Sequence, residues 1–182
     1  MAKAIGMVEC NTVSSGFKAA DDMAKTDEVE LIQAEVTCPG KFVILISGEI
    51  SAVRASVDRA AAAYTDRVID TFVLGNPHES IFPAIYGTAS TDGIDALGVL
   101  ETYDVAALIV AADVAAKTAI VDLLELRLAK GMCGKSYMTI TGSVSAVQAA
   151  IDSAKIAAGE KGMFLDEAVI PRPSEHLLPF IF

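Results

Sequence analysis

The hexapeptide Ala4-Ile5-Gly6-Met7-Val8-Glu9 recurs in the second half of the chain as Ala96-Leu97-Gly98-Val99-Leu100-Glu101. An internal repeat indicates a duplicated structural unit. The two halves match further in the same order, with a two-residue insertion in the second copy before its Gly-Lys pair: Ala19-Ala20-Asp21 with Ala111-Ala112-Asp113, Ala24-Lys25-Thr26 with Ala116-Lys117-Thr118, Gly40-Lys41 with Gly134-Lys135, Ser51-Ala52-Val53 with Ser145-Ala146-Val147, Asp58 with Asp152, and Pro77, Glu79 and Pro83 with Pro173, Glu175 and Pro179. The chain is therefore a tandem duplication, and we predict two domains, residues 1–90 and 91–182.

Each copy alternates strand and helix patterns in the same order. Apolar strand patterns in the first copy cover residues 4–8, 29–37, 42–47 and 68–74, and helical spacing covers residues 13–25 and 49–63. The second copy repeats this with strands at 96–100, 121–128, 136–141 and 163–169 and helices at 105–117 and 144–157. The order β-α-β-β-α-β predicts an α+β fold of two ferredoxin-like domains. A short helical turn at 80–84 and a polar linker at 87–95 are expected between them.

Composition and hydropathy indicate self-association. The 182 residues are 53% hydrophobic, and the mean hydropathy of +0.47 is high for a soluble protein. The longest apolar run, residues 105–116, contains Asp113 and is far shorter than the roughly 20 residues of a spanning helix. No secretory pattern begins the sequence, so we expect a location inside the cell and no membrane partner. The excess apolar surface and the duplication together favour a ring in which each chain supplies two neighbouring positions.

Charge and cysteine usage exclude further classes. The net charge is −10 and the basic residues are scattered, which argues against a nucleic-acid partner. The three cysteines, Cys10, Cys38 and Cys133, are odd in number and form no C-x-x-C pair, which argues against a disulfide framework and against a self-contained zinc site. Any metal site would have to gather cysteines from several chains.

One of these cysteines lies in a predicted tight turn, Thr37-Cys38-Pro39-Gly40-Lys41, between two apolar segments. The Pro-Gly pair predicts a type II turn, because Pro presets φ and Gly accepts the positive φ that follows. A thiol at such a tip is unusual, since free cysteine is among the most buried residue types.

Further short signatures accompany the two hexapeptides. They are Ala-Ala-Asp-Asp-Met-Ala-Lys ending at Lys25, Thr-Cys-Pro-Gly-Lys-Phe from residue 37, Gly-Glu-Lys-Gly from residue 159, and Val-Ile-Pro-Arg-Pro-Ser-Glu from residue 169. With these signatures the chain resembles the tandem-domain bacterial microcompartment (BMC) shell proteins, and among them the T-type shell proteins of propanediol-utilisation compartments. The resemblance covers nearly the whole chain, in both halves.

The resemblance implies a homotrimer whose six domains form a pseudohexagonal tile in a microcompartment shell, alongside other shell proteins. The loop after the second strand of each domain would line a central pore. Those residues are Thr37, Pro39 and Gly40 in the first copy and Gly131, Met132, Cys133 and Gly134 in the second. The resemblance also implies that Cys38 from three chains ligates one [4Fe-4S] cluster per trimer, with the fourth iron free of protein thiolate. Thiolates are the usual ligands of such clusters. The expected role is electron transfer across the shell or cluster delivery to encapsulated redox enzymes.

Several alternatives stand beside this interpretation. Cys38 would otherwise be a small pore-lining residue without metal, in a tile that conducts metabolites. Leaving the family aside, a duplicated ferredoxin-like fold also suits a cytosolic regulatory module that binds a small ligand. Cys133, which the Gly-Lys register aligns with Pro39, is interpreted either as a spare thiol near the pore or as buried packing, and Met132 is expected to narrow the opening. Cys10 is interpreted as core or interface filler.

The remaining candidates are cationic. Lys25 and Lys117 occupy equivalent places, and the family places this lysine at the tile edge. The simpler alternative is a solvated lysine that complements a helix dipole. Arg172 matches the family's edge arginine, although its first-copy equivalent is Asn76.

No catalytic pattern accompanies the two histidines. His78 and His176 do not align, and we expect both at the surface. The Gly-Glu-Lys-Gly stretch lacks the spacing and the following Ser or Thr of a phosphate-binding loop. We therefore expect a protein that is not an enzyme.

Overall fold

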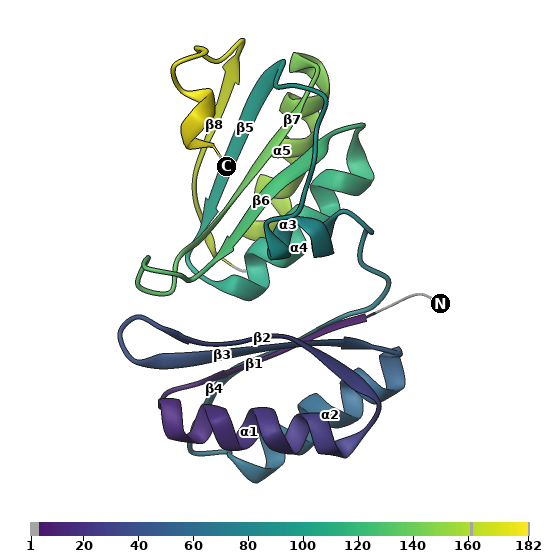
Figure 1. The fold of residues 1–182 in the computed structure, drawn as a ribbon, viewed down its shortest axis with the longest axis vertical. Coiled ribbons are helices and arrows are strands. Elements are labelled where there is room, and N and C mark those ends of the chain that lie inside the picture. The colour runs from purple at the N-terminus through teal and green to yellow at the C-terminus, as the bar shows by residue number, and fades with distance from the viewer. Residues whose placement is uncertain (1–3, 161, 182) are drawn as a thin grey trace. The chain divides into compact units, whose positions relative to one another are not determined.

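The computed structural model describes residues 4–160 and 162–181, and the chain divides into two compact units, Met1–Pro77 and His78–Phe182 (Figure 1). The units divide between Pro77 and His78, whereas the sequence placed the boundary between residues 90 and 91. The difference arises because the short helix α3 (Ile81–Tyr86) packs against the second unit.

The first unit is a four-stranded antiparallel sheet with two helices on one face (Figure 1). Its elements follow the predicted order, and the sheet order is β2-β3-β1-β4, so each helix connects two strands that are separated by a third. The elements are β1 (Ala4–Cys10), α1 (Val13–Thr26), β2 (Val29–Thr37), β3 (Lys41–Gly48), α2 (Ile50–Ala63) and β4 (Val68–Leu74).

The second unit repeats this arrangement after α3. Its sheet order is β6-β7-β5-β8, the equivalent of the first, and a 3-10 turn follows the last strand. The elements are β5 (Ala96–Thr102), α4 (Val105–Thr118), β6 (Asp122–Leu128), β7 (Ser136–Gly142), α5 (Val144–Gly159), β8 (Phe164–Pro171) and η1 (Leu178–Phe180). The α+β fold with two tandem ferredoxin-like domains is confirmed.

Strand register is conserved between the copies. Gly6 pairs with Ile46 on β3, and Gly98 pairs with Ile140 on β7. Both outer ladders are irregular at the same place, between Leu31 and Gln33 in the first unit and between Leu123 and Glu125 in the second. A duplicated gene explains a shared irregularity better than convergence does, because a bulge tends to persist within a family.

Close packing of a helix on the central strand explains the glycine in each hexapeptide. A Cβ on Gly6 would lie 2.6 Å from Val53 Cγ1 and 2.8 Å from Val57 Cγ2, and a Cβ on Gly98 would lie 2.7 Å from Val147 Cγ1. These approaches are shorter than carbon atoms tolerate. Only glycine therefore lets α2 and α5 reach the sheet at this depth.

The core of the first unit lies between this sheet face and its helices. Its fully buried members include Met23, Phe42 and Val53, and Cys10 belongs to the same cluster. Within the described part of the chain, no helix has the length and apolar composition that a membrane span requires.

Candidate functional site

The turn between β2 and β3 carries the exposed thiol of Cys38. The Gly40 N–H donates a 2.8 Å hydrogen bond to the Thr37 carbonyl, so Cys38 and Pro39 occupy the two central positions, and the peptide bond between them is cis. The predicted type II turn, with Pro39 and Gly40 at its centre, is therefore wrong. Gly40 instead follows the centre with φ +99°, and nothing lies within 4 Å of a Cβ placed on it.

The base of this turn is buried and polar, while its tip is exposed and uncharged. Cys38, Pro39 and Gly40 are exposed, whereas Thr37 is only 2% exposed. Among the described residues, the Thr37 hydroxyl has no hydrogen-bond partner. Lys41, which follows the tip, forms an ion pair with Glu9 at 3.2 Å. The cation nearest along the chain to Cys38 is thus paired with the adjacent strand.

The equivalent turn between β6 and β7 is longer and differently built. Four of its residues have left-handed φ: Ala129, Gly131, Cys133 and Gly134. The Met132 N–H donates to the Ala129 carbonyl at 3.5 Å, and the Ala129 N–H donates to the buried Ser136 hydroxyl at 3.1 Å. Cys133 is exposed, so its interpretation as buried packing is wrong.

The three thiols lie in different environments. Cys10 is fully buried, and burial, followed by the charge of Glu9, raises the pKa of its thiol. Cys38 and Cys133 are exposed on separate turns. In the described residues no group of three or more His, Cys, Asp or Glu side chains is arranged to hold a metal ion. A metal site built on Cys38 would need ligands from further copies.

The two candidate edge lysines form equivalent ion pairs in unequal surroundings. Lys25 Nζ lies 2.6 Å from Asp21 Oδ2, and both side chains are largely exposed. That hydrogen bond raises the pKa of Lys25. Lys117 Nζ lies 2.7 Å from Asp113 Oδ2, but the Asp113 side chain is only 9% exposed. Their tile-edge role stays a prediction, as does that of the exposed Arg172.

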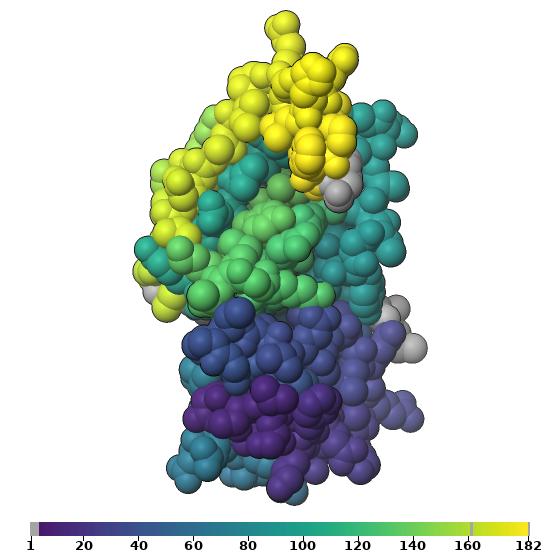
Figure 2. Space-filling model, turned by 60° about the vertical axis from the view of Figure 1, so that its left-hand side comes forward, coloured from purple at the N-terminus to yellow at the C-terminus, as the bar shows by residue number. Residues whose placement is uncertain are grey.

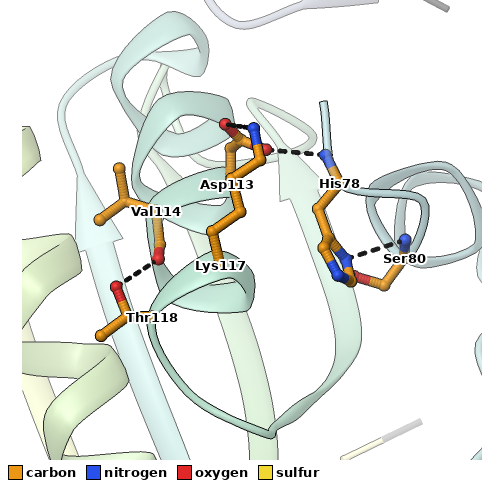
Figure 3. Close-up of polar contacts among 6 residues, drawn as sticks. All are labelled: His78, Ser80, Asp113, Val114, Lys117 and Thr118. Atoms are coloured by element: carbon orange, nitrogen blue, oxygen red, sulfur yellow. Dashed lines mark hydrogen bonds and ion pairs between the residues drawn. The ribbon is translucent and has the colours of Figure 1, made fainter. Parts of the chain in front are cut away.

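The buried Asp113 accepts a second hydrogen bond, besides that from Lys117, which sequence reasoning missed (Figure 3). The backbone N–H of His78 donates to Asp113 Oδ1 at 2.7 Å, and His78 Nδ1 lies 2.7 Å from the Ser80 hydroxyl. Asp113 thus joins residues that precede α3 to the middle of α4. The recurrence of aspartate in both Ala-Ala-Asp motifs, and of proline at Pro77 and Pro173, was the available signal.

Comparison with known proteins places both halves in one domain family. A family model described as BMC domain matches residues 4–77 and 96–173. The bacterial microcompartment shell protein PduT of Citrobacter freundii is 40% identical over 177 residues, which cover 97% of this chain and 96% of that protein.

Solved structures agree with this match. The crystal structure of a microcompartment protein from Desulfitobacterium hafniense DCB has a TM-score of 0.95 and 42% identity, over 98% of this chain and 99% of that chain. The fused permuted hexameric shell protein of the RMM microcompartment shares the fold at 21% identity, with a TM-score of 0.65 over 87% of this chain and 84% of that chain.

Proposed function

The chain belongs to the BMC-domain family of bacterial microcompartment shell proteins, and from this premise we propose that three copies form a shell tile with a [4Fe-4S] cluster bound between their Cys38 thiols. Three chains supply six domains, the number that a pseudohexagonal tile needs. Other shell proteins are the partners along the tile's edges. The role is structural and electron-transferring rather than catalytic.

The observation that carries the proposal is the exposed thiol at the tip of an uncharged turn. Free cysteine is normally buried, so an exposed one calls for a reason. One chain offers Cys38 as a single thiol on this turn, and rotation about a three-fold axis turns one thiolate into three convergent ligands. Iron–sulfur clusters are held by cysteine thiolates, so the donor chemistry fits.

The surroundings of Cys38 also suit a bulky inorganic group. Gly40, two residues after Cys38, adds no side chain to the turn, and a Cβ placed on it would meet nothing within 4 Å. The buried Thr37 hydroxyl has no hydrogen-bond partner among the described residues and directly precedes Cys38 in the chain. It is a donor whose hydrogen bond a cluster sulfur can accept. Lys41 forms an ion pair with Glu9 of β1, and this pair keeps the positive charge of Lys41 on the sheet side of the turn.

When bound, the cluster supplies one-electron transfer at the centre of the tile, or a cluster for delivery to encapsulated redox enzymes. The chain's own residues provide the thiolate and the short, exposed turn that holds it. The second-unit turn contributes Gly131, Met132, Cys133 and Gly134 to the rim of the same pore. Because the two turns differ in length and sequence, the pore has three-fold rather than six-fold chemistry.

A pore that conducts metabolites is the second candidate function. The observation that favours it is the absence of charge among Cys38, Pro39 and Gly40, together with the open space around Gly131 and Gly134. Small polar metabolites would pass such a rim without a strong electrostatic barrier.

Anaerobic purification separates the two functions. We expect about four iron atoms per three chains in the wild type, with a low-temperature EPR signal after reduction. Cys38→Ala should lose the iron and remain a trimer. Cys133→Ala is the matched control, because it removes the exposed thiol of the equivalent turn and should keep the iron. Iron retained in Cys38→Ala, or absent from the wild type with its thiols reduced, would refute the cluster and leave the pore.

A further inference from the structure

The segments that follow the last strand of each unit begin with the same local conformation. We call residues 76–90 the first tail and residues 172–181 the second tail. Each tail begins with a left-handed residue, with φ 52° at Asn76 and 50° at Arg172. The Ile81 N–H donates to the His78 carbonyl at 3.1 Å, and the Leu177 N–H donates to the Ser174 carbonyl at 2.8 Å.

A second hydrogen bond is shared as well. The Ser80 N–H donates to His78 Nδ1 at 3.3 Å, and the His176 N–H donates to the Ser174 hydroxyl at 3.3 Å. Equivalent positions therefore carry equivalent bonds although the side chains differ. The second tail therefore starts as the first tail does, although it continues as the 3-10 turn η1 where the first tail forms the helix α3.

The first tail docks on one edge of the second unit, formed by α4 and β6. We call this surface the covered edge: Ile109, Asp113, Leu123, Leu126 and Leu128. All five residues are buried. Ile81 and Ala84 of α3 are buried as they pack there, and the His78 N–H donates to Asp113 (Figure 3).

The equivalent edge of the first unit is formed by α1 and β2, and no described segment of that unit covers it. We call this surface the open edge: Phe17, Asp21, Leu31, Ala34 and Val36. Leu31 is 42% exposed whereas its equivalent Leu123 is 3% exposed, and Phe17 and Val36 are more exposed still. The Asp21 side chain is 60% exposed. Large apolar side chains gathered at one edge mark an interaction surface.

The second tail has the complementary apolar residues, and they too are exposed. Leu178 and Ile181 anchor the tail on Leu97 and Leu124 of its own unit. Phe180, by contrast, is 82% exposed and Leu177 is half exposed, whereas their equivalents Ala84 and Ile81 are buried. The tail thus lies at the surface of the second unit, in yellow in Figure 2.

Where the first tail has a small side chain and its edge a large one, the second tail has a large side chain and the open edge a small one. In the second unit, small Ala84 and large Leu126 line the same pocket. At the equivalent positions the tail has the large Phe180 and the open edge has the small Ala34. Well-packed surfaces pair large with small residues, so the second tail fits the open edge as the first tail fits the covered edge.

We infer that the second tail of one copy docks on the open edge of a second copy of this chain, where the Ser174 N–H donates to Asp21 and Phe180 packs on Ala34. Each chain has one such tail and one such edge, so the contact is head-to-tail and repeats until the ring closes. This inference rests on the proposed assembly into a tile and identifies the segments that join its chains.

Chemical crosslinking between copies tests the contact. The variant Ala34→Cys/Phe180→Cys, prepared as a mixture of 15N-labelled and unlabelled chains, is treated with a short bis-maleimide and digested. We expect crosslinked peptides joining positions 34 and 180, with one labelled and one unlabelled partner. The matched control is Ala84→Cys/Leu126→Cys, which should crosslink only within one isotope. Crosslinks at 34 and 180 within one isotope alone, or none while the control reacts, would overturn the inference.

The size exchange gives a second test that does not depend on crosslinking. Phe180→Ala should raise the midpoint concentration for assembly by roughly tenfold to a hundredfold, because a buried aromatic contact is lost. Ala34→Leu alone should also weaken assembly by crowding Phe180. The double variant Ala34→Leu/Phe180→Ala recreates the Leu126–Ala84 pairing and should restore much of the loss. Effects that simply add would contradict direct contact.

These results are independent of the iron. Assembled protein that binds iron through Cys38 without crosslinks between positions 34 and 180 would refute the tail contact and leave the cluster intact. Mixed-isotope crosslinks in protein that binds no iron would support the tail contact and refute the cluster.

Discussion

The two units share a fold and a strand register, but they differ in a helix cap and in the cover over one edge. The second unit has both the cap and the cover, and among the described residues the first unit has neither. Helix α4 is capped by Asp104, which accepts from the Ala107 N–H at 2.6 Å, while the equivalent Thr12 makes no such bond to α1. Asp113 is buried beneath the first tail, and the equivalent Asp21 is exposed. Each unit has an exposed thiol on the turn between its second and third strands, Cys38 on the shorter turn and Cys133 on the longer one.

This difference teaches how a duplicated chain can divide its tasks. A symmetric ring of identical domains would present six identical turns to its axis. Duplication allows one turn to keep a thiol for a ligand while the other turn lengthens. The open edge of the first unit has the apolar character that contact with another copy requires. We therefore expect variants at equivalent positions to have unequal effects.

The largest inequality concerns the thiols. In iron-free protein, Cys38 and Cys133 should both react quickly with iodoacetamide, and Cys10 should react at least about a hundredfold more slowly, because burial excludes the reagent and the raised pKa of Cys10 lowers its thiolate fraction at pH 7. Iron loading should protect Cys38 and leave Cys133 reactive. Peptide mass spectrometry reads all three sites. Equal protection of Cys38 and Cys133 would mean that the two turns do not divide their tasks.

The next inequality concerns the two aspartates. Asp113→Ala should lower the free energy of unfolding by about 2–3 kcal/mol, because it leaves the His78 N–H without its acceptor at a partly buried site and removes the ion pair between Asp113 and Lys117. Asp21→Ala should leave the unfolding of the dissociated chain unchanged, since that ion pair is exposed. Urea denaturation followed by circular dichroism measures both. Similar losses for the two variants would show that the first tail does not stabilise the second unit through Asp113.

The smallest inequality concerns helix caps. Asp104→Ala should cost about 1 kcal/mol, because α4 loses the acceptor for the Ala107 N–H. Thr12→Asp should stabilise the first unit by up to about 1 kcal/mol, since it places the same cap on α1. The same denaturation experiment detects each change. No gain from Thr12→Asp would indicate that the Thr12–Ser15 hydrogen bond already holds this helix end.

Much of the fold followed from the sequence because the duplication doubles every local signal. The hexapeptides predicted the strands β1 and β5, whereas the close helix contact at Gly6 and Gly98 was recognised only in the structure. The turn type was wrong because a Pro-Gly pair fits two hydrogen-bond registers. In one register Lys41 donates to the Cys38 carbonyl, and in the other Gly40 donates to the Thr37 carbonyl. The structure has the second, next to the β2–β3 pair Thr37–Lys41.

Other features of the site depend on contacts that spacing does not reveal. Asp113 lies in an Ala-rich helix, where its sequence neighbours indicate no partner for its charge. It nevertheless accepts a hydrogen bond from the backbone N–H of His78, which is far away in the sequence. The predicted boundary after residue 90 stays a prediction, and the division into compact units after Pro77 was not foreseen, because the linker composition did not show that α3 packs on β6. Long-range contacts of the backbone leave little trace in composition or periodicity.

The measurement that tests the central claim most directly is an iron anomalous-difference map from crystals of anaerobically purified protein. The account predicts one peak between three copies, within bonding distance of Cys38 from each chain and remote from Cys133. A trimer whose axis shows no iron peak while Cys38 is reduced, or a peak held by residues other than Cys38, would contradict it.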